Sequence, residues 1–217
     1  MGKIIRISDF NNVNITKGDK MCRDFLMQIR KKPNGISDMP DRAQDVLSFF
    51  KINDLSSGVP IIEILTKLGF KIYQGDLEPK KLSAYIAVDP KFKDAFESNK
   101  ITCVQAGDNI GHKRFALAHE LAHYLFDFRE DESLYYYNTY FSEQEDNELE
   151  ERRANKFAAN LLMPENAFRN KYEEYKKLYS KVDIVNELGQ YFLVSSKAVL
   201  LRFSELGIDG FDSKAEK

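Results

Sequence analysis

Residues 114–127 read RFALAHELAHYLFD, and the rest of the fold is predicted outward from this stretch. It contains His119, Glu120 and His123 in the pattern H-E-x-x-H. On an α-helix, positions four apart lie one turn above each other on the same face, so both imidazoles can reach one metal ion. Glu120 lies about 100° around the helix axis from His119 and can reach a water molecule on that ion without ligating it. The pattern is typical of zinc metalloproteases.

A second interpretation of this stretch needs no metal. Most of its other residues are apolar, so it could be a core helix in which both histidines make ordinary hydrogen bonds. The chain has only three histidines, the third being His112, which we expect on the surface. Chance would produce the pattern in roughly one such chain in a few hundred. We favour the metal site because a third ligand in a suitable context follows downstream.

The composition excludes several classes of protein. Hydrophobic residues make up 43% of the 217 residues and charged residues 30%, as in ordinary globular proteins. The net charge of −2 gives no overall argument for nucleic-acid binding. No stretch approaches the ~20 apolar residues that span a bilayer, and the first residues lack the apolar core of a signal peptide. Cys22 and Cys103 are expected to be free thiols, so we expect a cytoplasmic protein without a membrane partner.

A second long helix is predicted from residue 143 to 163, where apolar residues recur at helical spacing. Glu151 and Asn155 share one face of this helix with the small residues Ala154 and Ala158. If that face packs on the first helix, Glu151 can complete the metal site.

Between the two helices, residues 127–151 are acidic and aromatic. They contain ten carboxylates and one basic residue, interrupted by four tyrosines and Phe141. The stretch could be a lid or a substrate wall, with one tyrosine donating a hydrogen bond to a developing oxyanion. It could also be a solvated acidic loop that leads into a helix, and we favour this for most of its residues.

The remaining elements predict an α+β fold. Residues 70–73, 83–88 and 101–105 favour β-branched and aromatic side chains and are expected to form a small, mostly antiparallel three-stranded sheet packed on the motif helices. Further helices are predicted to begin near Asp19, Asp41 and Pro60.

After Pro164 the chain is predicted to be helical. Helices at 182–192 and 197–206, joined by a short turn, suggest a helix-turn-helix. The second of them offers Ser196, Lys197 and Arg202 to DNA, which is a thin basic patch. We favour a structural or partner-binding role for this segment, with DNA binding as the weaker alternative.

Three stretches together resemble the ImmA/IrrE family of metallopeptidases: RFALAHELAHYLF, ERRANKFAANLLMP and FLVSSKAVLLRFSELGI. The family joins an R-F-x-x-A-H-E-x-x-H helix to an E-x-x-A-N/D-x-F-A-x-x-L-L-M-P helix, followed by a helical tail. The match covers roughly residues 41–210, with Phe203 in place of the usual leucine of the tail. Residues 1–40 are not covered by it.

The resemblance implies a role for each site residue. It makes His119 and His123 zinc ligands, Glu120 the catalytic carboxylate and Glu151 the third protein ligand. Asn155 stands where the family has Asn or Asp, and would hydrogen-bond a ligand histidine and fix its tautomer.

The choice of Glu151 as third ligand has two competitors. Arg153 stands where many relatives carry Glu or Gln, which favours Glu151 over position 153. Glu148 and Glu150 are carboxylates on the same predicted helix but fit the motif less well.

The function implied by the resemblance is zinc-dependent endopeptidase activity. Two histidines, a glutamate and a water make an open tetrahedral zinc site, which Mn²⁺ or Fe²⁺ could also occupy. Relatives cleave helix-turn-helix repressors, so the chain would be an anti-repressor in stress or mobile-element regulation. The alternative is a catalytically silent metal-binding module that sequesters a repressor or a toxin-like partner. We expect an N-terminal extension (1–40), a metallopeptidase-like domain (41–164) and a C-terminal helical segment (165–217).

Overall fold

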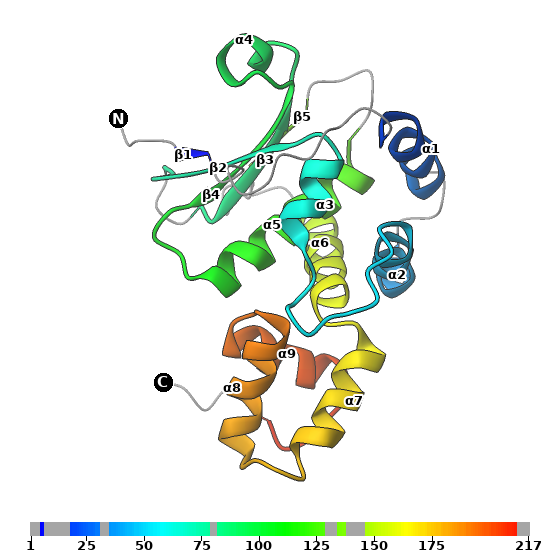
Figure 1. Ribbon diagram of the computed structural model, residues 1–217, viewed down its shortest axis with the longest axis vertical. Helices are drawn as coiled ribbons and strands as arrows, with labels where there is room; N and C mark the ends of the chain where they lie inside the picture. Colours follow the sequence, from blue (N-terminus) through cyan, green and yellow to red (C-terminus); the bar gives the residue numbers. More distant parts are fainter. Residues whose placement is uncertain are drawn as a thin grey trace.

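The computed structural model describes residues 5–6, 18–30, 35–78, 82–128, 134–137 and 146–211. The strands are β1 (Ile5–Arg6), β2 (Lys71–Gly75), β3 (Ala84–Val88), β4 (Lys100–Gln105) and β5 (Leu134–Tyr137). The helices are α1 (Gly18–Arg30), α2 (Met39–Phe49), α3 (Ile61–Lys67), α4 (Phe92–Phe96), α5 (Ile110–Phe126), α6 (Asp146–Leu162), α7 (Glu165–Tyr175), α8 (Lys181–Phe192) and α9 (Ser196–Glu205), and a 3-10 helix covers Ile36–Asp38. The sheet lies at one end of the molecule and α7 to α9 at the other (Figure 1).

The sheet differs from the predicted one in its strand order. The three expected strands are present as β2, β3 and β4, but the order within the described residues is β1-β2-β4-β3-β5. β4 lies between β2 and β3, so it pairs in parallel with β2 and antiparallel with β3. Three of the four strand pairings are antiparallel and one is parallel, so the sheet is mixed but mostly antiparallel; the expected number of three strands was wrong, because β1 and β5 extend the sheet. β2 and β4 run in the same direction and β3 runs in the opposite one, so the position of β4 beside β2 creates a parallel pair.

Helix α5 is the central rod of the fold. Asn109 caps its first turn by accepting a hydrogen bond of 2.9 Å from the backbone N–H of His112. Every residue from Ala116 to Leu125 is buried. A helix that is buried on all sides needs neighbours on all sides, and α5 contacts β3, β4, α1, α3 and α6.

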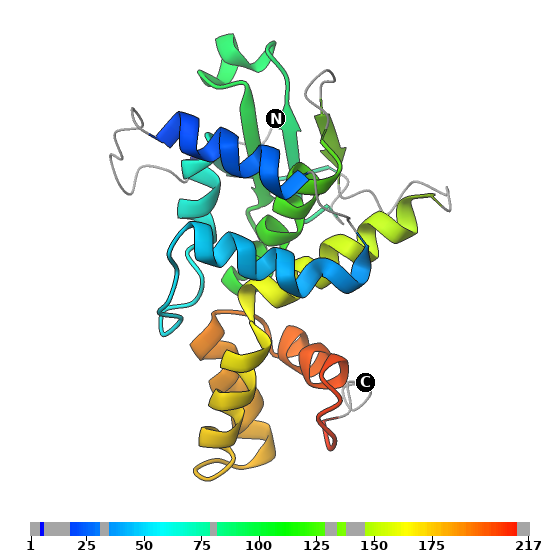
Figure 2. The same cartoon turned by 90° about the vertical axis from the view of Figure 1, so that its right-hand side faces the viewer.

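Helix α6 packs against both α5 and α2. Figure 2 shows α6 and α2 side by side. Ala154 and Ala158, predicted to allow a close approach of the two long helices, are buried. Helix α1 also joins this core, since the rings of Phe25 and Phe49 stack with centroids 4.0 Å apart. No disulfide joins Cys22 and Cys103, as predicted, and both side chains are buried.

The C-terminal helices are attached to the end of α6 and to the first turn of α5. Ser195 caps α9 by accepting a hydrogen bond of 3.2 Å from Ala198, and Leu193 ends α8 in the left-handed conformation. The Arg114 guanidinium of α5 donates to the carbonyl oxygen of Leu193 at 3.0 Å. Among the residues that the structure describes, no helix is long and apolar enough to cross a membrane.

Candidate metal centre

The residues expected to share a metal ion lie together in the structure. His119 and His123 are one turn apart on α5, and their Nε2 atoms are 3.0 Å apart. Glu151 reaches them from α6: Oε2 lies 3.1 Å from His119 Nε2, and Oε1 lies 3.4 Å from His123 Nε2. Three potential ligand atoms from two helices therefore converge on one point.

This geometry fits a divalent metal ion. Ligands at about 2.0–2.1 Å from a tetrahedral ion are about 3.3 Å from one another, and the three separations of 3.0, 3.1 and 3.4 Å lie close to that value. Two imidazoles and a carboxylate are also the ligand set of catalytic zinc sites, which keep the fourth position open. The histidine side chains are at most 3% exposed, whereas the side chain of Glu151 is 30% exposed, so the site opens to solvent on the Glu151 side.

Each histidine is oriented through its other ring nitrogen. The Asn155 side-chain oxygen lies 3.1 Å from His119 Nδ1, where the sequence predicted a partner for a ligand histidine. Asp127 Oδ2 lies 2.7 Å from His123 Nδ1. A carboxylate can only accept here, so Nδ1 of His123 donates its proton to Asp127, and the Nε2 lone pair is left for a metal.

Asp127 is the site residue that sequence reasoning missed. It was counted only as the first carboxylate of the acidic stretch. Its position four residues after His123 on the same helix could have indicated the contact. Its second oxygen, Oδ1, accepts a hydrogen bond from the Arg153 guanidinium of α6.

Glu120 is completely buried beside these groups. The backbone of Ile86 on β3 lies near its carboxyl group, but neither oxygen has a well-formed hydrogen bond within the described residues. Burial raises the pKa of Glu120 to about 8; the charge of His123 opposes this shift and that of Glu151 adds to it. Burial of a carboxyl group without a good hydrogen-bond partner costs free energy of folding. Such groups are found most often at functional sites.

Without a metal ion, His123 and Glu151 form an ion pair. Burial opposes a charge on His123, but hydrogen bonds to Asp127 and Glu151 outweigh it and raise the pKa of His123 to about 9. Burial likewise opposes a charge on Glu151, but hydrogen bonds to both histidines outweigh it and lower the pKa of Glu151 to about 2. A bound cation would take the place of the proton on His123.

The structure also places the remaining candidates. Glu148 is exposed and Glu150 half-buried, and neither belongs to the group of converging ligands within the described residues. The side chains of Tyr135, Tyr136 and Tyr137 and all of Tyr140 lie outside the described residues, as do the atoms of Phe141. The alternative in which one tyrosine faces the site therefore concerns side chains outside the described residues.

Two residues outside the metal group were assigned to the surface. The side chain of His112 is 52% exposed, as expected, and its Nε2 lies 3.2 Å from Ser83 Oγ. Arg202, however, is only 1% exposed and does not offer its charge to DNA. Its guanidinium donates to the Met163 carbonyl oxygen at 3.1 Å and to the Asn160 side-chain oxygen at 2.8 Å, because the end of α6 leaves carbonyl groups that need donors.

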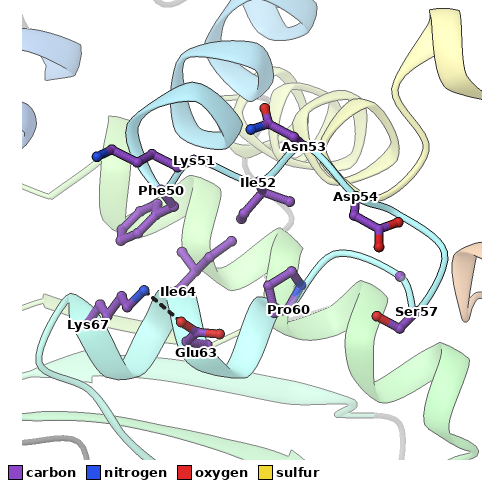
Figure 3. A pocket seen from close by; sticks show the side chains of 11 residues that line it. Phe50, Lys51, Ile52, Asn53, Asp54, Ser57, Pro60, Glu63, Ile64 and Lys67 are labelled. Carbon is purple, nitrogen blue, oxygen red and sulfur yellow. Dashed lines mark ion pairs between the residues drawn. The ribbon is translucent and has the colours of Figure 1, made fainter.

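A cavity of about 420 Å³ lies at a different place, between the end of α2 and α3. Its floor is apolar, with Phe50, Ile52 and Ile64, and its rim carries the Lys67–Glu63 ion pair (Figure 3). No residue of the metal group lines it.

Comparison with known proteins places the chain in a family. No curated protein matches it. A Mycobacterium tuberculosis transcriptional regulator of known structure is similar in fold, with a TM-score of 0.50 and 18% identity over 87% of this chain and 52% of that one. The chain thus spans about half the length of that regulator, and the likeness concerns the fold alone. A family model, Peptidase_M78 (IrrE N-terminal-like domain), matches residues 66–204, which include the whole metal group. Because this match covers more than half of its length, the chain belongs to the Peptidase_M78, IrrE N-terminal-like family.

Proposed function

We propose that this protein is a zinc-dependent endopeptidase. The observation that carries the proposal is the convergence of His119, His123 and Glu151 beside the buried carboxyl group of Glu120. The two imidazoles and the Glu151 carboxylate would hold the ion. When bound, zinc lowers the pKa of a water molecule and polarises a peptide carbonyl.

The residues of the chain supply the proton transfers. Glu120 is close enough to His123 and Glu151 for their charges to act on its carboxyl group. It would take a proton from the attacking water and pass it to the leaving amine nitrogen, as general base and then general acid. Asp127 and Asn155 hold the two imidazoles during this transfer. The burial of Glu120 keeps bulk water away from its oxygens, which strengthens its interactions with the reacting groups.

The substrate that we propose is a helix-turn-helix transcriptional repressor, so the protein would act as an anti-repressor in stress or mobile-element regulation. The resemblance to the ImmA/IrrE family supports this, and the fold shared with a transcriptional regulator agrees with a regulatory setting. In this proposal residues 41–164 carry the chemistry, residues 165–217 hold the repressor, and residues 1–40 extend the first domain. The protein would act in the cytoplasm, with Mn²⁺ or Fe²⁺ as possible substitutes for zinc.

The test uses purified protein, Zn²⁺ and a purified candidate helix-turn-helix repressor. We expect the wild-type protein to cleave the repressor. Glu120→Gln should retain the metal but cleave at least about 100-fold more slowly, because general acid–base catalysis contributes typically 10²–10⁴-fold. Zinc content by mass spectrometry under native conditions provides the control. Cleavage by the variant at the wild-type rate would rule out Glu120 as the proton carrier.

The alternative is a silent binding module, and the protonation of Glu120 separates it from the enzyme. In the metal-free chain burial raises the pKa of Glu120 to about 8, so its carboxyl group is a base at neutral pH only when a bound cation lowers that pKa again. In that alternative the protein sequesters the repressor or a toxin-like partner. A stable stoichiometric complex without cleavage products would support it, and size-exclusion chromatography of the same mixture distinguishes the two functions.

A further inference from the structure

Both ring nitrogens of His123 face a carboxylate: one belongs to α6, and the other is held by a residue of α6. On one side, Nε2 lies 3.4 Å from Glu151 Oε1. On the other, Nδ1 lies 2.7 Å from Asp127 Oδ2, and the second oxygen of Asp127 accepts from Arg153. Arg153 follows Glu151 by two residues on α6, so these contacts close a ring from α5 to α6 and back.

The position of Asp127 is electrostatically unfavourable for the helix on which it lies. Asp127 is the residue that ends α5, and its backbone N–H donates to the His123 carbonyl oxygen at 2.9 Å. The C-terminal end of a helix carries partial negative charge and disfavours a carboxylate. The Arg153 guanidinium compensates for this, because it brings a positive charge from the neighbouring helix to the same carboxylate.

Burial separates this ion pair from an ordinary surface pair. The side chain of Asp127 is 7% exposed and that of Arg153 is 12% exposed. Exposed ion pairs contribute little to stability, but removal of one partner of a buried pair leaves a charge that water cannot reach. Without Arg153, the Asp127 carboxylate would turn towards solvent or towards another donor, and Oδ2 would no longer be aimed at His123.

We propose that Arg153 is a positioning residue of the metal site, which acts through Asp127 to fix the tautomer and orientation of His123. This inference rests on the proposed metal site. Arg153 lies two positions beyond Glu151 on α6, so the helix that supplies one ligand also supplies the residue that orients a ligand of α5. This role agrees with the close spacing of the ligand atoms of α5 and α6, which lie within 4.8 Å of one another.

A double-mutant cycle on metal affinity tests the proposal. Zn²⁺ affinity is measured by competition with a chromophoric chelator for the wild type, Asp127→Asn, Arg153→Met and the double variant. Loss of such a supporting contact typically weakens metal binding 10–100-fold, and we expect about 10-fold or more for each single variant. The double variant should bind no more weakly than Asp127→Asn alone, because the Asp127 carboxylate that Arg153 orients is already absent.

Arg152→Met is the matched control, because Arg152 is the exposed neighbour of Arg153 on α6 and its loss changes the net charge equally. It should leave the affinity within about two-fold of wild type. Thermal unfolding of each chelator-treated variant shows whether it is folded. If Arg153→Met folds poorly, Arg153→Lys takes its place in the test: it keeps the positive charge beside Asp127 and should bind Zn²⁺ with most of the wild-type affinity. The absorption spectrum of bound Co²⁺ reports the ligand geometry directly.

Two results would overturn the inference. One is wild-type Zn²⁺ affinity in Arg153→Met. The other is an equal loss from Arg153→Met in the wild-type and Asp127→Asn backgrounds, which would mean that Arg153 acts independently of Asp127. A wild-type protein that binds no Zn²⁺ would instead overturn the proposed function, so the two failures are distinguishable.

Discussion

Glu120 combines complete burial with an ionisable group, and this combination makes the stability of the protein depend on pH. The pKa of Glu120 rises from 4.5 to about 8 because burial disfavours the charged form. The folded state therefore holds a proton that the unfolded state releases above about pH 4.5. The stability contributed by that proton is complete below pH 4.5 and is lost as the pH rises towards 8.

Replacement of Glu120 by glutamine removes this pH dependence, since glutamine stays neutral. In chelator-treated protein we expect Glu120→Gln to gain stability over the wild type as the pH rises from 5 to 8, on the order of a few kcal/mol. Thermal unfolding of both proteins at several pH values measures the difference. His123 titrates in both proteins, so the comparison cancels most of its contribution. A difference in Tm that stays constant from pH 5 to pH 8 would contradict the assignment of a buried, proton-holding Glu120.

A site residue could be predicted from the sequence when its partner lies nearby on the same helix, and less well when its partner lies on another helix. His119 and His123 share a face because the helix period alone places them there. Glu151 required one further assumption, that the small residues of its helix face α5, and the buried Ala154 agrees with it. Arg153 could not be assigned, because its contact with Asp127 depends on the rotation and depth of α6 against α5, which no local pattern encodes.

At the scale of elements, the first turn of α5 and the turn between α8 and α9 are in unusually close contact. A Cβ atom on Gly111 would lie 2.6 Å from the backbone nitrogen of Ser195 and 2.7 Å from the backbone carbon of Val194. Both are backbone atoms, so they cannot turn aside as the end of a flexible side chain can. Arg114, one turn further along α5, donates to the Leu193 carbonyl oxygen in the same turn.

Gly111→Ala should therefore destabilise the protein, although alanine favours a helix by about 1 kcal/mol over glycine. We expect a net loss of about 1–3 kcal/mol, because the added methyl group must push the α8–α9 turn away from α5. Urea unfolding followed by circular dichroism measures it. Gly107→Ala is the matched control: nothing lies within 4 Å of a Cβ at Gly107, so its stability should change by less than about 0.5 kcal/mol. An increase in stability for Gly111→Ala would show that this contact is not tight.

At the scale of the whole molecule, the α+β class followed from the order of the predicted elements, but the sheet order did not. Neighbouring strands in sequence usually pair, which would place β2 beside β3. Instead the side chains of β4, of which Cys103 and Val104 are at most 1% exposed, fill the centre of the sheet. Burial does not single β4 out, because four of the five residues of β3 are buried as well, so the central position depends on how the strands pack together rather than on the pattern of any one strand. Arg202 was misassigned for a similar reason, because its partners lie on α6.

One hydrophobic core connects all the layers, and this determines how the molecule should respond to a metal. The core includes Ile29 of α1, Leu121 of α5, Phe157 of α6 and Phe203 of α9, all at most 1% exposed. Elements that share a core usually unfold together. Binding at a site between α5 and α6 should therefore stabilise the C-terminal helices as well as the helices that hold the ligands.

We expect Zn²⁺ to raise the Tm of the entire protein in a single transition. Free metal at 100 times its dissociation constant stabilises by about 2.7 kcal/mol, which is about 5–10 °C for a chain of this length. Differential scanning calorimetry with and without Zn²⁺ measures the shift, and a chelator should reverse it. His123→Ala should abolish the shift because it removes a ligand. Two separate transitions, with only the first moved by Zn²⁺, would contradict the shared core and would mean that the C-terminal helices unfold independently of the metal centre.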